Sequence, residues 1–270
     1  MKLQEDKILE RFIDELKKPV KNSYQLYNDY VLLCSSNNRE IRIKMKELEI
    51  QNQKRFLKYL EPDMISIETC SYNQSDYAKP HSYIYDSECF ENIDIYNFQM
   101  SKTCITKELY QLYDKGYQND YPSDSPVVDV NWYEAMMFSY WIGCRLPLEV
   151  EWEYVANVGL EDIPFENDIM LDYAWYSMNS NNYLESVGKK LPNKFGIYDM
   201  QGLVWEWCLD SIELDKNPYL IQRYIPYRVC RGGSFYSFLE VLSPTYRYGE
   251  KEVYSSRDLG FRVVKSDVVI

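Results

Sequence analysis

Five short segments, each with at least one aromatic residue and most with a glycine or charged residues, follow one another between residues 130 and 263 of this 270-residue chain. They occupy residues 130–135, 145–154, 192–207, 231–235 and 259–263. Asn131 followed by Glu134 is a capping-box pattern and predicts a helix start. Pro147 and the acidic residues after it predict another helix, because carboxylates meet the positive end of the helix dipole there. The order of these signals, more than any one of them, limits the folds that the chain can adopt.

In this order, the five segments resemble the formylglycine-generating enzyme or sulfatase-modifying factor domain, a variant of the C-type lectin fold. The resemblance runs from about residue 63 to residue 264. It implies an α+β, C-type lectin-like domain over residues 62–270, preceded by an N-terminal helical extension over residues 1–61. It says less about function, because this fold carries copper oxidases, iron-dependent sulfoxide synthases and non-catalytic ligand-binding proteins.

Composition narrows the choice of partners and compartment. The formal charge of −12 disfavours nucleic acid and anionic membranes as partners, because proteins that bind phosphates normally present a basic face. The first residues lack the apolar core of a signal peptide, and no later apolar run reaches the length of a membrane span. We therefore expect a cytoplasmic protein.

Cysteine and histidine usage argues against several kinds of active site. The seven cysteines form no C-x-x-C pair and their number is odd, so we expect most of them to be buried, small apolar residues. His81 is the only histidine. The chain therefore offers no ligand spacing for a zinc site, and one histidine in a loop gives little support for a Ser-His-Asp triad. We expect His81 to be a surface residue.

Residues 3–60 have the pattern of a polar, helical extension. A first helix ends near Pro19, and a helical hairpin follows, whose second arm spans about residues 38–60. That arm carries an apolar stripe at Ile41, Met45, Leu48, Phe56 and Leu60. We expect the stripe to dock on the rest of the chain. A partner-binding arm is the alternative.

The lectin-like domain begins after residue 63 with strand-like runs at 64–67 and 93–98. Thr106 is the expected cap of the next helix, and Gly116 its left-handed terminator. In the helix after Pro147, the family's common threonine is Leu148, so a hydroxyl cap is absent. Arg145, Glu149, Glu151 and Glu153 could pair for acid/base chemistry, but the resemblance indicates buried ion pairs that hold the helix in place.

Calcium is a second matter on which the resemblance bears. Some relatives bind calcium through a glutamate at the position of Glu206. Here the family's common asparagine after Gly202 is Leu203, and the asparagine-rich insertion is shortened to residues 177–182. Calcium needs six to eight oxygen ligands. The resemblance thus allows calcium at Glu206 without favouring it, and we expect no other cofactor.

The segment after 231–234 decides between catalysis and binding. Catalytic oxidases of the family hold copper(I) there with two cysteines, the soft ligands that this ion prefers. This chain has no cysteine after Cys230, and the two positions fall on Ser237 and within residues 242–245. The iron-dependent relatives need several histidines. The resemblance therefore implies that both chemistries are lost.

What remains is the open face that relatives diversified by retroelements use for ligand contact. Tyrosine and arginine, which are typical of binding surfaces, dominate it here. The candidate ligand-binding residues are Tyr236, Phe238, Tyr246, Arg247, Tyr248, Tyr254 and Arg257. We expect a non-catalytic protein that binds a protein or small-molecule ligand on this C-terminal face. The alternatives are an enzyme of the same family with an unrecognised site, and a structural subunit held by the helical extension.

Overall fold

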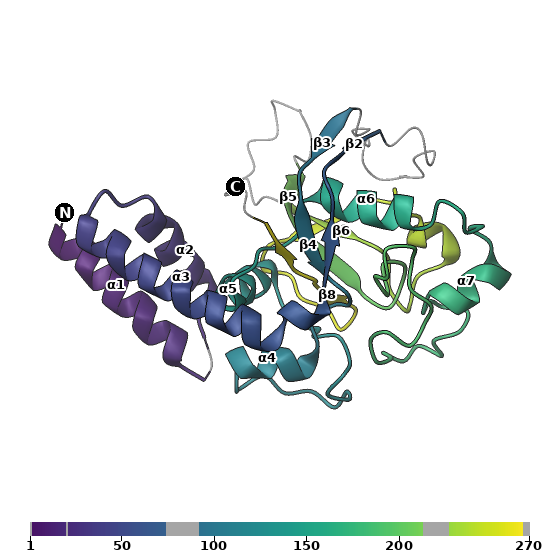
Figure 1. The fold of residues 1–270 in the computed structure, drawn as a ribbon. Helices are drawn as coiled ribbons and strands as arrows, with labels where there is room; N and C mark the ends of the chain where they lie inside the picture. The colour runs from purple at the N-terminus through teal and green to yellow at the C-terminus, as the bar shows by residue number, and fades with distance from the viewer. Residues whose placement is uncertain (1, 20, 74–91, 213–226, 267–270) are drawn as a thin grey trace, which may run out of the picture.

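A computed structural model describes residues 2–19, 21–73, 92–212 and 227–266. His81 and Cys89 lie outside the described residues. Three helices form an N-terminal arm that projects from a mixed domain of short strands and helices (Figure 1). None of the helices in the described ranges has an apolar stretch long enough to cross a bilayer.

The arm consists of α1 (Lys2–Lys17), α2 (Ser23–Cys34) and α3 (Arg39–Tyr59). Asparagine side chains cap α2 and α3 by accepting backbone N–H groups: Asn22 from Gln25, and Asn38 from Glu40. The predicted stripe on α3 is confirmed, with Ile41, Met45, Phe56 and Leu60 buried and Leu48 partly buried.

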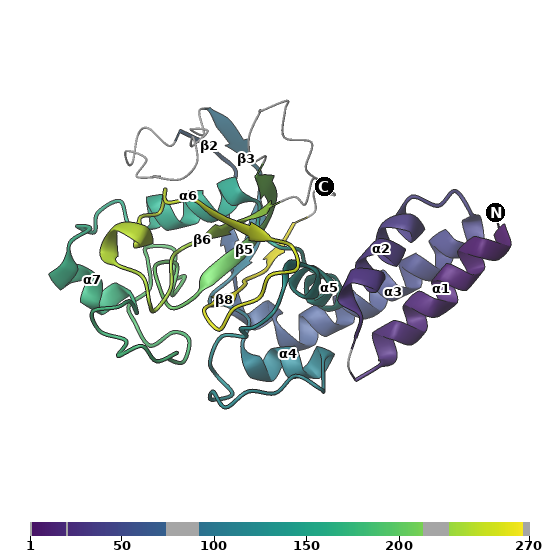
Figure 2. The ribbon, with the colours of Figure 1, turned by 180° about the vertical axis from the view of Figure 1, so that it is seen from behind.

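The arm docks on the domain, as predicted: the α3 stripe belongs to a buried cluster that includes domain residues, and aromatic rings of α2 add contacts that were not predicted. Tyr24 and Tyr133 lie 5.1 Å apart between ring centroids, and Tyr27 and Trp132 lie 5.2 Å apart, both in edge-on geometry. Phe12 and Leu26 of the arm belong to the same buried cluster as residues of the domain's C-terminal segment. Figure 2 shows the contact from behind, with α5 (Trp132–Ile142) next to the arm. Arm and domain therefore share one hydrophobic core.

Within the described ranges, the strands form three small sheets. A three-stranded sheet has the order β1-β4-β9, a hairpin pairs β2 with β3, and a four-stranded sheet has the order β7-β6-β5-β8. All pairs are antiparallel except β5 with β8. Their bounds are β1 (Met64–Ile67), β2 (Cys70–Tyr72), β3 (Ile93–Ile95), β4 (Phe98–Ser101), β5 (Trp205–Ile212), β6 (Tyr227–Arg231), β7 (Tyr248–Lys251), β8 (Leu259–Gly260) and β9 (Val264–Lys265).

The predicted strand at 64–67 is confirmed, whereas the prediction of one strand over 93–98 is wrong. The run divides into β3 and the start of β4, because Asn97 leaves the ladder. The Asn97 amide oxygen accepts bonds from the Thr69 backbone N–H at 2.6 Å and from its hydroxyl at 2.8 Å. A side chain that serves the neighbouring loop in this way interrupts a strand.

Four further helices flank the sheets: α4 (Lys107–Tyr113), α5, α6 (Glu149–Gly159) and α7 (Asn167–Tyr173). The Thr106 cap and the capping box of Asn131 with Glu134 are confirmed. Gly116 as terminator is wrong, because α4 ends at Tyr113 with Asp114 in an extended conformation. The Gly116 N–H instead bonds the Pro19 carbonyl, which ties this loop to the arm.

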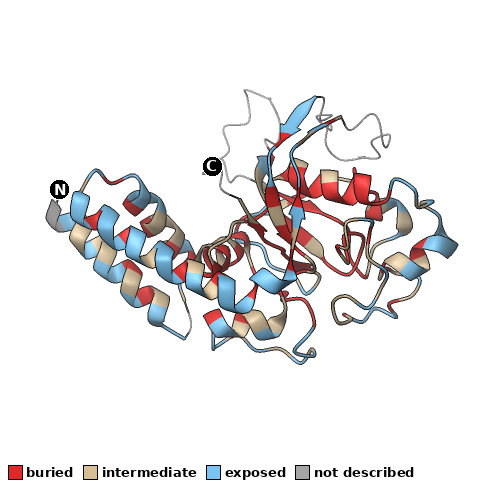
Figure 3. Ribbon diagram, viewed as in Figure 1, coloured by how far each residue is buried: buried red, intermediate tan, exposed pale blue. Residues whose placement is uncertain are grey.

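Buried ion pairs hold α6 and the last strands in place, as the resemblance implied. Arg231, buried, contacts Glu149 and Glu153 of α6 at 2.6 and 2.8 Å. Arg145 pairs with Glu151 at 2.6 Å. Around these pairs α6 is mostly buried, as Figure 3 shows. These charged groups are paired with one another in the interior. They hold the helix and strands in place, and none of them is a free acid or base.

Candidate ligand-binding site

The seven predicted contact residues lie after β6, and the structure brings them together only in part. Tyr236 and Arg257 meet directly, with the guanidinium carbon 4.8 Å from the ring centroid. Phe238 is 71% exposed, the most exposed large apolar side chain in the described part of the chain. An apolar ring held in water in this way is a candidate contact for another molecule.

Tyr246, Tyr248 and Tyr254 gather near Trp205, the first residue of β5. The Trp205 ring lies 5.2 Å from that of Tyr248 and 6.1 Å from that of Tyr246, between centroids. Trp205, Tyr248 and Tyr254 also line a cavity of about 140 Å³. Two of the seven predicted residues, Tyr248 and Tyr254, thus line an aromatic hollow.

The cavity contains residues that the sequence did not single out: Trp205, Glu250 and Asp258, with Cys230 and Leu259. Period-two alternation along β7 could have found Glu250, since it shares a strand face with Tyr248. Trp205 stands out in the sequence only as a neighbour of Glu206. Asp258 had no local signal, because it reaches the cavity from the loop before β8.

Arg247 differs from its neighbours, because its guanidinium turns inward. It donates to Glu149 at 2.7 Å, and its side chain is 14% exposed. Its Nε is buried without a hydrogen-bond partner in the described structure. Part of its role is therefore to support the buried Glu149–Arg231 pair.

Glu206 is buried, and its carboxylate is saturated by protein donors. Arg262 donates to both oxygens, at 2.6 and 2.8 Å, and the Trp152 indole N–H donates at 2.8 Å. The Cys104 thiol adds a contact at 3.2 Å. Across the described ranges, no three His, Cys, Asp or Glu side chains are grouped as metal ligands would be. The carboxylate considered for calcium is thus the anchor of Arg262.

The positions where the resemblance places the two oxidase cysteines have structural roles. The Ser237 hydroxyl accepts the Ser234 backbone N–H at 2.9 Å and closes a turn. Leu242, at the end of η3 (Leu239–Leu242), is fully buried, and so is Thr245. Near Ser237, the Ser234 hydroxyl donates to Asp258 at 2.9 Å, which joins this turn to the wall of the aromatic cavity.

Leu203 shows what replaced the family's asparagine. Its φ of 60° is left-handed, a conformation that asparagine adopts more readily than leucine. The side chain is fully buried in a cluster with Cys104, Val128 and Phe235. Burial of the leucine offsets the backbone strain. The loop thus contributes an apolar side chain to the core where the family commonly has a polar one.

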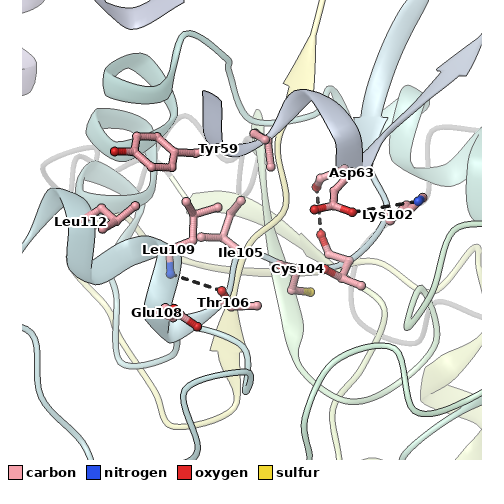
Figure 4. Close-up of a pocket in the computed structure, with 12 residues that line it drawn as sticks. Tyr59, Asp63, Lys102, Cys104, Ile105, Thr106, Glu108, Leu109 and Leu112 are labelled. Atoms are coloured by element: carbon pink, nitrogen blue, oxygen red, sulfur yellow. Dashed lines mark hydrogen bonds and ion pairs between the residues drawn. The ribbon is translucent and has the colours of Figure 1, made fainter. Parts of the chain in front are cut away.

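Two other hollows lie where arm and domain meet. One, of about 260 Å³, is lined by the end of α3, the end of β4 and α4, with Tyr59, Lys102, Glu108 and Leu112 around it (Figure 4). The other, of about 480 Å³, lies between α2 and α5. Neither contains any of the seven predicted residues.

Comparison with known proteins agrees with this architecture. Residues 49–267 match the family described as "Sulfatase-modifying factor enzyme 1-like domain". The chain belongs to this family. The match begins inside α3, so it includes the end of the arm and all of the described mixed domain. The fold is accordingly the α+β, C-type lectin-like fold of formylglycine-generating enzymes.

Curated relatives match about half of the chain. "Serine/threonine-protein kinase pkn1" of Chlamydia pneumoniae is 34% identical over 153 residues, which are 52% of this chain and 24% of the relative. "Formylglycine-generating enzyme" of Thermomonospora curvata is 33% identical over 41% of this chain and 44% of the relative. "Hercynine oxygenase" of Mycobacterium tuberculosis is 31% identical over 49% and 35%, respectively. The chain thus spans about a quarter to a half of these relatives, and their activities do not transfer with the match.

Among solved structures, Treponema denticola variable protein 1 is similar with a TM-score of 0.61 and 24% identity, covering 75% of this chain and 94% of that one. PvdO from Pseudomonas aeruginosa has the same TM-score at 19% identity, covering 75% and 93%. At these identities the likeness shows the shared fold alone.

Proposed function

We propose that this member of the family is a non-catalytic binding protein that contacts a protein or small-molecule ligand on the face formed by residues 236–258. The observation that carries the proposal is the exposure of large aromatic side chains on this segment, where Tyr248 and Tyr254 line a hollow together with Trp205. Phe238 is 71% exposed and Tyr254 42% exposed, while Trp205 and Tyr248 lie in the wall. Aromatic rings of this kind supply large contact areas at low entropic cost.

The roles of Ser237 and Leu242 support binding over oxidase chemistry. Ser237 closes a turn and Leu242 packs in the core, so both positions contribute to the shape of the face. The relative named formylglycine-generating enzyme is the reason to test the enzyme alternative as well. That alternative predicts turnover, which binding does not.

Site-specific photo-crosslinking in the native host tests the proposal, because it captures a ligand whose identity is unknown. A benzophenone amino acid replaces Phe238 or Arg257, which are both exposed on the face. The same replacement at Tyr96, 62% exposed between β3 and β4, is the control. We expect adducts, identified by mass spectrometry, from the two face positions and none from Tyr96. Equal adducts from all three positions, or adducts from none, would contradict the proposal.

A second candidate function is that of a subunit held in an assembly by the arm. Ile43, Ile50 and Leu57, seven residues apart on α3, are 49%, 53% and 49% exposed on the side opposite the core. Such a stripe is typical of helix association. Ile50→Lys should then reduce the assembly size in light scattering of native extracts separated by gel filtration. An unchanged elution position would speak against this role.

A further inference from the structure

The aromatic cavity described above has a composition that suggests the chemistry of its ligand. It lies at one end of the four-stranded sheet, where cross-strand register pairs Cys230 with Tyr248 and Trp205 with Leu259. Trp205, Tyr248 and Tyr254 supply aromatic surface, while Glu250 and Asp258 supply carboxylates. Rings and acids therefore border one space of about 140 Å³.

Neither carboxylate has a cationic partner in the described structure. Glu250 accepts the Tyr248 hydroxyl at 2.6 Å, and Asp258 accepts the hydroxyls of Ser234 at 2.9 Å and Ser256 at 2.5 Å. The nearby Glu252, by contrast, is paired with Arg228 at 2.7 Å. The cavity is thus bordered by two carboxylates that form no ion pair with any described residue, although Arg228 lies opposite Glu250 in the sheet register.

Cys230 and Tyr248 line the cavity, and the pKa of each is raised mainly by burial. Burial raises the pKa of the Cys230 thiol well above its usual value, and the charges of Glu250 and Asp258 raise it further. The pKa of Tyr248 is also raised, first by burial and then by its bond to Glu250. Of the two carboxylates, both therefore add to the effect of burial at Cys230, and Glu250 alone does so at Tyr248.

We propose that this cavity binds an alkylammonium group, carried by a small molecule or by a methylated lysine side chain. Ring faces attract a cation through their quadrupole, and the attraction grows when the cation leaves water. Each carboxylate already accepts hydrogen bonds from hydroxyl groups. An arginine binds best when both oxygens of a carboxylate are free to accept its two parallel N–H groups, so these carboxylates suit a guanidinium less well. A rounded ammonium ion needs only charge and ring surface. This inference rests on the proposed binding function and names its ligand class.

Calorimetry with the full-length protein tests the inference with two isosteric probes. Choline carries a quaternary ammonium, and 3,3-dimethylbutan-1-ol replaces its nitrogen by carbon and is neutral. We expect saturable binding of choline, with the neutral alcohol at least about tenfold weaker. Glu250→Gln and Tyr254→Ala should each weaken choline by about tenfold, while Tyr96→Ala leaves it unchanged.

A third probe separates the two sources of the cation. N-acetyl-trimethyllysine amide should bind more tightly than choline if the ligand is a protein side chain, and less tightly if it is a small molecule. Equal affinity for choline and the neutral alcohol, no saturable binding of either cation, or insensitivity to both variants would overturn the inference. If these results occur while crosslinks at Phe238 and Arg257 persist, the binding face stands and only the ligand class is wrong. If neither cation binding nor crosslinking at Phe238 and Arg257 is observed, the proposed function is wrong as well.

Discussion

Asp199 is a buried acid whose replacement should stabilise the protein in a pH-dependent way. Its side chain is 3% exposed, with Oδ2 accepting the Gly188 N–H at 2.7 Å and Oδ1 without a hydrogen-bond partner among the described residues. Burial raises its pKa from 3.8 to about 6, although the Gly188 bond and the charge of Arg262 act in the opposite direction. Asparagine is the natural substitute, because it keeps an acceptor for Gly188 and tolerates the φ of 58°.

The sign and size follow from linkage. Well below pH 3.8 the acid is neutral in both the folded and the unfolded state, so it contributes no pH dependence. As the pH rises from 3.8 toward 6, the unfolded state releases its proton before the folded state does, so stability falls. Above pH 6 the folded state buries the charge, and the difference between pKa values of about 6 and 3.8 corresponds to roughly 3 kcal/mol of lost stability. Asp199→Asn avoids this loss. The free energy of unfolding of the variant should exceed that of the parent protein by about 1 kcal/mol at pH 4.5 and by about 3 kcal/mol at pH 7.

Urea unfolding of parent and variant at several pH values between 4.5 and 7.5 measures this difference. Other groups titrate equally in both proteins and cancel. Asp162→Asn, at an exposed position, controls for the change in net charge. A variant that is less stable than the parent at pH 7, or a difference that does not grow with pH, would refute the reasoning.

Four further predictions concern the departures from the family pattern and the inward-turned arginine. Leu203→Asn should lower the free energy of unfolding by about 2–4 kcal/mol in urea titrations, because lost burial outweighs relief of the left-handed backbone. Leu148→Thr should raise it by up to about 1 kcal/mol by adding the missing half of a cap whose other half, Glu151 to the Leu148 N–H, is present; a lower melting midpoint would show that the leucine is packing. Arg247→Ala should lower the free energy of unfolding by about 1–3 kcal/mol, since Glu149 loses a charged donor; a stability equal to the parent's would show that this contact does not support the fold. Copper(I), oxygen and a sulfatase-type cysteine peptide should yield no aldehyde by mass spectrometry above a metal-free control.

Local signals in the sequence were sufficient for helix starts and for the family blocks. Asn131 with Glu134 and Thr106 cap their helices as predicted, because a cap depends on residues within one turn. The end of α4 was not predictable in the same way. Gly116 donates to Pro19, almost a hundred residues earlier, and this long-range contact determines the path of the loop.

The site was predictable as a region but not as a geometry. Of the tyrosines after residue 234 that were predicted to contact a ligand, Tyr248 and Tyr254 line one cavity. The direction of Arg247 depends on Glu149, which is 98 residues away, and Asp258 enters from another loop. Pairings across such separations are set by the tertiary fold, which spacing along the chain does not reveal.

The core that arm and domain share determines how the molecule comes apart. Because Phe12 and Leu26 are buried together with Trp132 and Phe261, the arm cannot leave without exposing the interior of the domain. We therefore expect one cooperative unfolding transition, with amides of α2 and α5 exchanging their hydrogens at similar, slow rates. Removal of the first 60 residues would yield a destabilised fragment and not a free lectin-like domain. Point changes on the surface are consequently the informative way to dissect what each part of this chain binds.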